Sequence, residues 1–102
     1  GALDMVNFGA KSTVPEKYIK RNLFVHNPQV TLMRTTPEEN YDIGCWISEK
    51  LNAMNGEVRF MLPLKGVSAI DTLGQPFYDP DATKALFDAI ESNFKQTKIF
   101  FV

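Results

Sequence analysis

The sequence predicts an α/β protein with a mainly parallel sheet of about four strands and helices on both faces. Three observations predict this class. Short, nearly continuous apolar runs alternate with two amphipathic helical segments, which is the pattern of strand–helix–strand units. The first helical segment passes into the next apolar run with almost no loop, as α-to-β connections do. Glycine and proline mark the turns after the apolar runs.

Length and composition limit the classes of protein to consider. The 102 residues suffice for one domain, so residues 1–102 are expected to form a single α/β subdomain. The 11 basic and 12 acidic residues are scattered, which argues against nucleic acid or an anionic membrane as a partner. The single cysteine, Cys45, suits a reducing compartment, so a cytoplasmic location is expected. Apolar runs at both ends suggest a piece of a longer protein.

The first third of the chain is expected to hold two strands. Residues 2–6 form a short apolar run that ends at the turn signal Asn7-Phe8-Gly9. Residues 10–21 are polar and compatible with one helical turn from Pro15. The second strand is the run Leu23-Phe24-Val25, which ends at His26-Asn27-Pro28. Residues 29–35 are expected to be a loop or a single turn, because Leu32-Met33 interrupts their alternation.

Two helices follow, each with a capping signal at its start. Thr36-Pro37-Glu38-Glu39 fits a capping box, and Asn55-Gly56 ends the first helix. The apolar residues expected on its inner face are Ile43, Trp46, Ile47, Leu51 and Met54. The second helix starts at Asp79-Pro80-Asp81, and its inner face is expected to contain Leu86, Phe87, Ile90 and Phe94. Residues 57–62 are the third expected strand and residues 99–102 the fourth.

Polar, turn-forming groups follow three of the expected strands. Ligands of open parallel sheets lie beyond the carboxyl ends of the strands, so these groups would meet at one edge if the strands are parallel. The start of the first helix would approach the same edge. Backbone N–H groups, hydroxyls, one arginine and one lysine could hold an anion there. The candidate ligand-binding residues are Asn7, Gly9, His26, Asn27, Arg34, Thr35, Lys65, Gly66, Ser68 and Asp71.

Each candidate also has a purely structural explanation. Gly66 can simply turn the chain, and Ser68 and Asp71 can cap a turn. His26 is the only histidine and has no second histidine or cysteine near it, so no metal site is predicted. Cys45 is interpreted as a packing residue. Phe77 and Tyr78 either fix their loop onto the sheet or form the wall of a pocket.

Four blocks of the sequence, residues 1–9, 25–40, 62–71 and 74–80, resemble an uncharacterised family of bacteria, archaea, fungi and plants. That family shares the ATP-binding domain of the tomato tobamovirus-resistance protein. The resemblance implies a longer, Rossmann-like protein with two subdomains, of which this chain is the closing portion. It also implies homodimers, and glycine-rich nucleotide loops upstream, so that any ATP would bind through residues outside this chain.

Three functions remain open at this point, and the cofactor is unknown. The first is a ligand-binding subdomain that forms one wall of a cleft for a nucleotide, a phosphorylated molecule or a carboxylate, with the upstream subdomain as its partner. The second is part of a small-metabolite enzyme that uses His26 and Asp71 as acid or base. The third is a module for dimerisation or protein interaction. We expect the first of these functions, the ligand-binding subdomain.

Overall fold

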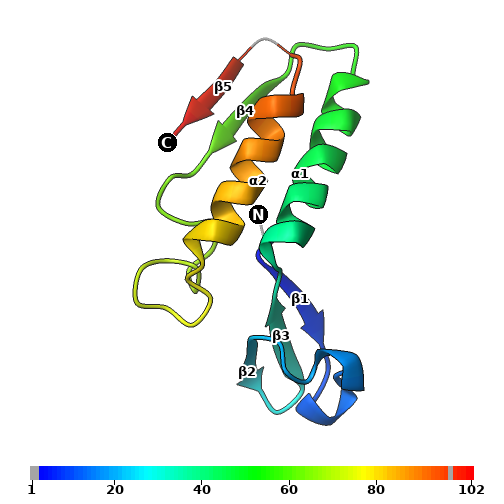
Figure 1. Ribbon diagram of the computed structural model, residues 1–102, viewed down its shortest axis with the longest axis vertical. Coiled ribbons are helices and arrows are strands. Elements are labelled where there is room, and N and C mark those ends of the chain that lie inside the picture. The colour runs from blue at the N-terminus through cyan, green and yellow to red at the C-terminus, as the bar shows by residue number, and fades with distance from the viewer. Residues whose placement is uncertain (1–2, 97) are drawn as a thin grey trace.

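The computed structural model describes residues 3–96 and 98–102 and shows an elongated molecule of 44 × 27 × 20 Å (Figure 1). A three-stranded sheet projects from one end, and two helices lie beside a two-stranded sheet at the other (Figure 1). Two short 3-10 turns, Lys11–Thr13 and Glu16–Tyr18, precede the second strand. The elements are β1 (Met5–Phe8), β2 (Leu23–Asn27), β3 (Val30–Arg34), α1 (Pro37–Asn52), β4 (Arg59–Leu62), α2 (Pro80–Asn93) and β5 (Lys98–Phe101).

The expected mainly parallel sheet of four strands is wrong. β1 and β2 both pair antiparallel with β3, and only β4 and β5 pair in parallel. The cause lies between β2 and β3, where Asn27 Oδ1 accepts a hydrogen bond from the Gln29 N–H at 2.8 Å. This local turn reverses the chain at once, and two strands joined by so tight a turn must run antiparallel.

β3 is the central strand of this first sheet, although residues 29–35 were expected to be a loop or a turn. Thr31 and Met33 are buried, while Val30 and Leu32 on the opposite face are half-buried. A strand that is covered on both faces does not show one apolar and one polar side, so the expected alternation is absent. The first strand is also displaced: it covers Met5–Phe8, and Ala2 lies outside the described residues.

Helix α1 begins as predicted. Thr36 Oγ1 accepts from the Glu39 N–H at 3.2 Å, and Glu39 Oε1 accepts from the Thr36 N–H at 2.9 Å, which completes the capping box. The expected inner face is wrong in part, because Trp46 is 60% exposed and Met54 53% exposed. The fully buried positions of α1 are smaller residues on one stripe, Asn40, Gly44 and Ser48. Gly44 lies directly against α2, because a Cβ on it would be 2.6 Å from the Ala89 Cβ.

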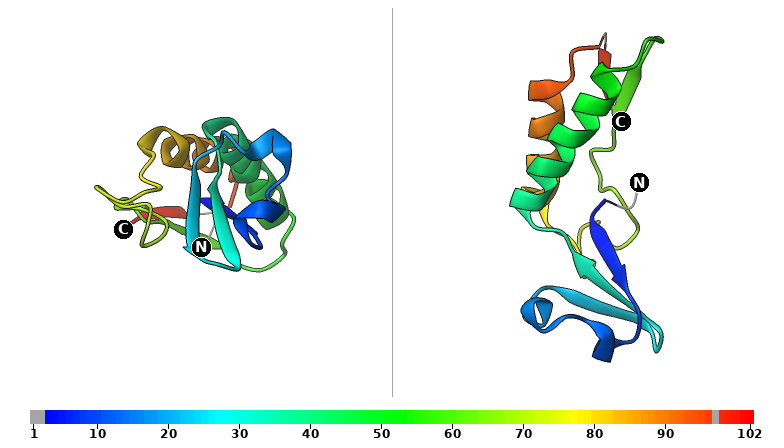
Figure 2. Two further views of the ribbon diagram at one scale, coloured as in Figure 1. Left: turned by 90° about the horizontal axis from the view of Figure 1, so that it is seen from below. Right: turned by 90° about the vertical axis from the view of Figure 1, so that its right-hand side faces the viewer.

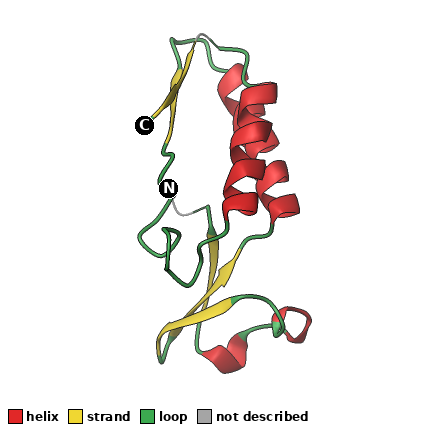
Figure 3. Cartoon of the chain, turned by 60° about the vertical axis from the view of Figure 1, so that its left-hand side comes forward, coloured by secondary structure: helices red, strands yellow, loops and turns green. Residues whose placement is uncertain are grey.

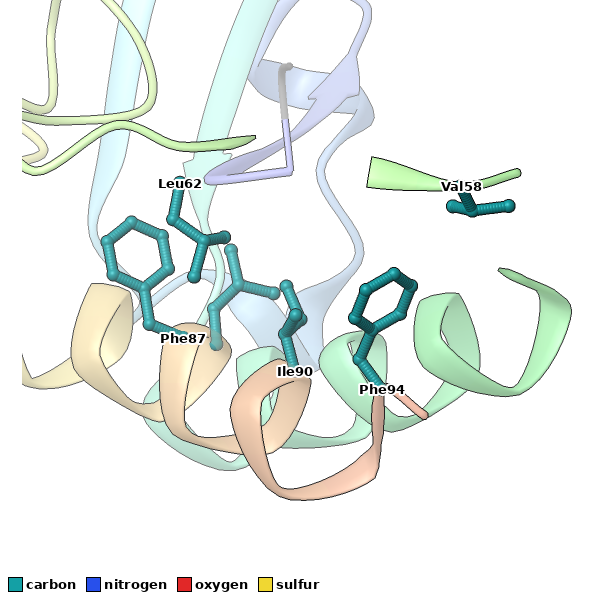
Figure 4. Packing of buried hydrophobic residues seen from close by; sticks show 6 residues of the cluster. Val58, Leu62, Phe87, Ile90 and Phe94 are labelled. Carbon is teal, nitrogen blue, oxygen red and sulfur yellow. The ribbon is translucent and has the colours of Figure 1, made fainter. Parts of the chain in front are cut away.

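The apolar core lies between the helices and the β4–β5 sheet. Leu86, Phe87, Ile90 and Phe94 are buried as predicted, and Val58 and Leu62 cover them from the sheet side (Figure 4). Figure 3 shows both helices on the same side of this sheet, so the expectation of helices on both faces is wrong. The right-hand view of Figure 2 shows the first sheet as a separate projection below the helices.

Candidate functional site

The long loop between β4 and α2 folds back onto the end of β3. Phe77 is fully buried within it: its ring lies edge-on to Phe24 of β2 with centroids 6.3 Å apart. Its N–H donates to the Ile70 carbonyl at 2.8 Å. Gly66 has a φ of +121°, and a Cβ there would lie 2.8 Å from the Asp71 carbonyl oxygen. Only glycine therefore lets the chain turn this closely.

A buried ion pair between Arg34 and Asp71 holds this loop. Arg34 Nη2 lies 2.7 Å from Asp71 Oδ1, and the two side chains are only 3% and 1% exposed. Arg34 Nε also donates to the Phe77 carbonyl at 2.9 Å. The second carboxylate oxygen of Asp71 accepts from the Val67 N–H at 3.1 Å and from Thr83 Oγ1 at 3.3 Å. Both charges are thus hydrogen-bonded on several sides, as burial of an ion pair requires.

A second set of buried polar groups adjoins the pair. Asp4 is fully buried, and one of its carboxylate oxygens accepts a hydrogen bond from Ser68 Oγ. Its other oxygen has no partner among the described residues. Thr35 Oγ1 donates to the Leu3 carbonyl at 2.8 Å and accepts from Asn40 Nδ2 at 2.9 Å. These bonds join the start of the chain, the end of β3, the loop and α1 into one polar core.

A cavity of about 670 Å³ opens beside this polar core. Lys65, Gly66 and Asp71 contribute to it from the loop, and Thr83 and Lys84 from the first turns of α2. Its apolar wall consists of Leu64, Leu73, Tyr78, Phe87 and Phe101. Lys84 bonds with Asp88 at 2.5 Å, which raises the pKa of its ammonium group, whereas no ion pair between described residues involves Lys65. Lys65 is therefore the lining cation without an ion pair among the described residues, and the carboxylates of Asp88 and Glu91 line the same cavity.

Both helix starts are capped by side chains that accept from an N–H of the first turn. The capping box occupies the start of α1, and Asp79 Oδ1 accepts from the Ala82 N–H at 3.0 Å at the start of α2. Burial alone would raise the pKa of Glu39, but the hydrogen bond from the Thr36 backbone and the nearby Arg21 lower the pKa overall. An anion bound at the start of α1 would therefore be repelled by the Glu39 carboxylate.

Six of the ten sequence-predicted site residues lie at the polar core or at the cavity. Arg34, Thr35 and Ser68 belong to the polar core, Lys65 and Gly66 line the cavity, and Asp71 does both.

The other four predicted residues lie toward the far end of the first sheet. Register pairs Phe8 and Val25 with Thr31, so Asn7, Gly9, His26 and Asn27 gather near the β2–β3 turn. Four residues of extended strand, roughly 13 Å, separate that turn from Arg34. The structure therefore does not bring His26 and Asp71 together.

Several important residues were missed or only partly assigned. Asp4 and Asn40 were not predicted, although an acidic residue within the run Leu3-Asp4-Met5-Val6 is a signal of a buried partner. Thr83 was missed too, because it looks like an ordinary helix residue. Phe77 fixes the loop onto the sheet and Tyr78 lines the cavity, so each of the two alternatives holds for one of them.

The described residues form neither a metal-ligand cluster nor a membrane-spanning helix. Among residues 3–96 and 98–102 no three or more His, Cys, Asp or Glu side chains gather closely enough to hold a metal ion. Within the same residues no helix has the length and apolarity to cross a membrane.

Fold and site together define a small α/β domain with a buried polar core next to an open cavity. The chain belongs to the family described as "Uncharacterised protein family (UPF0261) C-terminal domain", whose model matches residues 1–102. This confirms the resemblance noted from the sequence.

Relatives in bacteria and a plant support the assignment. A UPF0261 protein of Rhizobium meliloti is 57% identical over 95% of the chain, and one of Clostridium tetani is 53% identical over all of it. The ToMV resistance protein Tm-1 of Solanum lycopersicum is 54% identical over 84% of the chain, and the ToMV susceptible protein tm-1 is 52% identical. The chain spans 24% and 25% of the two bacterial relatives and 11% of the tomato resistance protein.

Proposed function

We propose that this C-terminal domain forms one wall of a small-molecule cleft whose ligand carries a phosphate or carboxylate group next to an apolar or aromatic part. The observation that carries the proposal is the cavity of about 670 Å³, a volume typical of ligand pockets. Lys65 supplies the charge for the anionic group. Tyr78, Leu73 and Phe87 offer flat apolar surface for the rest of the ligand.

The polar core supports this pocket without contacting the ligand through its charges. Arg34 and Asp71 neutralise each other, so their role in the proposal is to fix the loop that carries Lys65 and Gly66. Asp71 is also a poor general acid or base in this pair, because its protonation would leave the buried charge of Arg34 unpaired. The geometry therefore favours binding over the alternative enzyme that uses His26 and Asp71.

The test is a ligand screen on a full-length protein that contains this domain. Nucleotides, phosphorylated metabolites and carboxylates are added, and a rise in melting temperature identifies ligands of the folded state. The affinity of each hit is then measured by calorimetry for the wild type and for Lys65→Ala. Loss of one charge contact is expected to weaken binding about tenfold, which corresponds to ~1.4 kcal/mol.

Control variants keep the outcome clear. Lys20→Ala removes an exposed lysine outside the cavity, and its affinity should equal that of the wild type. His26→Ala tests whether the far end of the first sheet takes part, as the sequence alone suggests. Equal affinity of Lys65→Ala and wild type would contradict the proposed pocket. A tenfold loss in His26→Ala would instead move the site to the hairpin turn.

A further inference from the structure

Within the described residues the β4–β5 sheet has two strands, so β4 pairs along one of its two edges. The Val102 N–H donates to the Leu62 carbonyl at 2.9 Å, and the Leu64 N–H donates to the Val102 carbonyl at 2.6 Å. In a parallel ladder alternate residues turn both backbone groups to the same side. Leu62 and Leu64 thus face β5, while the backbone groups of Arg59 and Met61 face the outer edge of β4.

Helix α1 extends over that outer edge. Figure 1 shows β5, β4, α2 and α1 in this order across the molecule, so α1 lies on the side of β4 away from β5. Beneath it is an apolar hollow of about 210 Å³. Ile47 of α1 lines it together with Leu3, Phe60, Leu62, Val67 and Ile90. The underside of α1 therefore has an incomplete apolar cover.

We propose that the outer edge of β4 pairs with an apolar β-strand contributed by the rest of the same polypeptide, which lies beneath α1 and fills this hollow. The length of the relatives supports this occupant, since the chain accounts for only 24% and 25% of the two bacterial proteins. A parallel strand is expected, because helix-covered sheets of this kind are parallel and their strands almost wholly apolar.

A second copy of the chain fits the edge less well. Two copies related by a two-fold axis would pair β4 with β4 in antiparallel orientation, each presenting the same edge. Because α1 overhangs that edge, the pairing would bring two α1 helices over the same pair of strands. The strand from the same polypeptide meets no such obstacle.

The first test is amide hydrogen exchange on a full-length protein in which residues 1–102 form the C-terminal part. The Met61 N–H faces the outer edge, whereas the Leu62 N–H faces β5 and serves as the internal reference. We expect both amides to exchange more slowly than an unstructured amide by at least about 100-fold, as paired strand amides do. Rapid exchange of Met61 beside a slow Leu62 would overturn the proposal.

The second test identifies the occupant. The photoreactive residue benzoylphenylalanine is placed at position 47 in the hollow or, as the matched control, at position 46 on the exposed outer face of α1. An intrachain cross-link from position 47 to a segment outside residues 1–102, and none from position 46, supports the proposal. Cross-linked dimers, or no cross-link from position 47, would each overturn it. Neither test involves Lys65, so failure here leaves the ligand pocket unaffected.

Discussion

Single residues decide how the loop and the helices come together, and Arg34 with Asp71 is the clearest case. Removal of one partner leaves a buried, uncompensated charge, which costs on the order of 3–5 kcal/mol. We expect Asp71→Asn and Arg34→Met each to lower the free energy of unfolding by about this amount. Urea denaturation followed by far-UV circular dichroism measures it.

The double variant distinguishes pairing from two independent effects. In Arg34→Met/Asp71→Asn no unpaired charge remains, so the loss should be smaller than the sum of the two single losses. Strictly additive losses would mean that the two side chains stabilise the fold independently, for example through the bond from Arg34 to the Phe77 carbonyl.

Gly44 gives a second prediction at this scale. A Cβ at this position would lie 2.6 Å from the Ala89 Cβ and 2.8 Å from the Leu86 carbonyl oxygen, and this backbone atom cannot move aside by itself. Gly44→Ala should therefore separate α1 from α2 and lower the free energy of unfolding by about 1–3 kcal/mol. Gly56→Ala is the matched control, because nothing lies within 4 Å of its Cβ. Equal effects of the two would contradict the close helix contact.

Whole elements were predictable where the sequence carries local signals. Both helices and the parallel strands β4 and β5 follow from capping residues and apolar spacing. β3 was missed because both its faces are covered, and the pairing of β2 was missed because the turn chemistry of Asn27 was taken as a strand end. Four of the ten predicted site residues meet at the polar core. Sequence alone could not pair Arg34 with Asp71, because tertiary folding joins them across 37 positions.

The start of α1 gives the prediction at the scale of an element. The lowered pKa of Glu39 means that its charged form is favoured in the folded state. Its contribution is fully present above the ordinary pKa of 4.5 and is lost as pH falls through the lower folded value. The stability difference between wild type and Glu39→Gln should therefore shrink below about pH 4.5. Because Glu39 is partly exposed, the stability difference between the two proteins should stay within about 1 kcal/mol. A difference that grows toward acid, in urea titrations at several pH values, would contradict this.

Across the whole molecule, one loop links the two sheets. Phe77 packs on Phe24, its carbonyl binds Arg34, and the neighbouring Pro76 carbonyl accepts from Asn22 Nδ2 at 3.0 Å. Phe77→Ala should lower the free energy of unfolding by about 3–5 kcal/mol. It should also speed hydrogen exchange in β2, because the first sheet loses its attachment.

Tyr78→Ala provides the control for this prediction. Tyr78 is the next residue but is 43% exposed and lines the cavity, so its loss should cost less than about 1 kcal/mol. If Tyr78→Ala were as damaging as Phe77→Ala, the loop would depend on the cavity wall and not on its contact with the first sheet.

The position of the only tryptophan has a practical consequence. Trp46 lies on the outer side of α1 with Lys50 above its ring, so most of its indole is exposed to water while the chain is folded. Its emission should already resemble that of a denatured chain and report unfolding poorly. In a longer protein that contains this chain, a blue-shifted emission from Trp46 would reveal a neighbouring segment that excludes water from the outer side of α1.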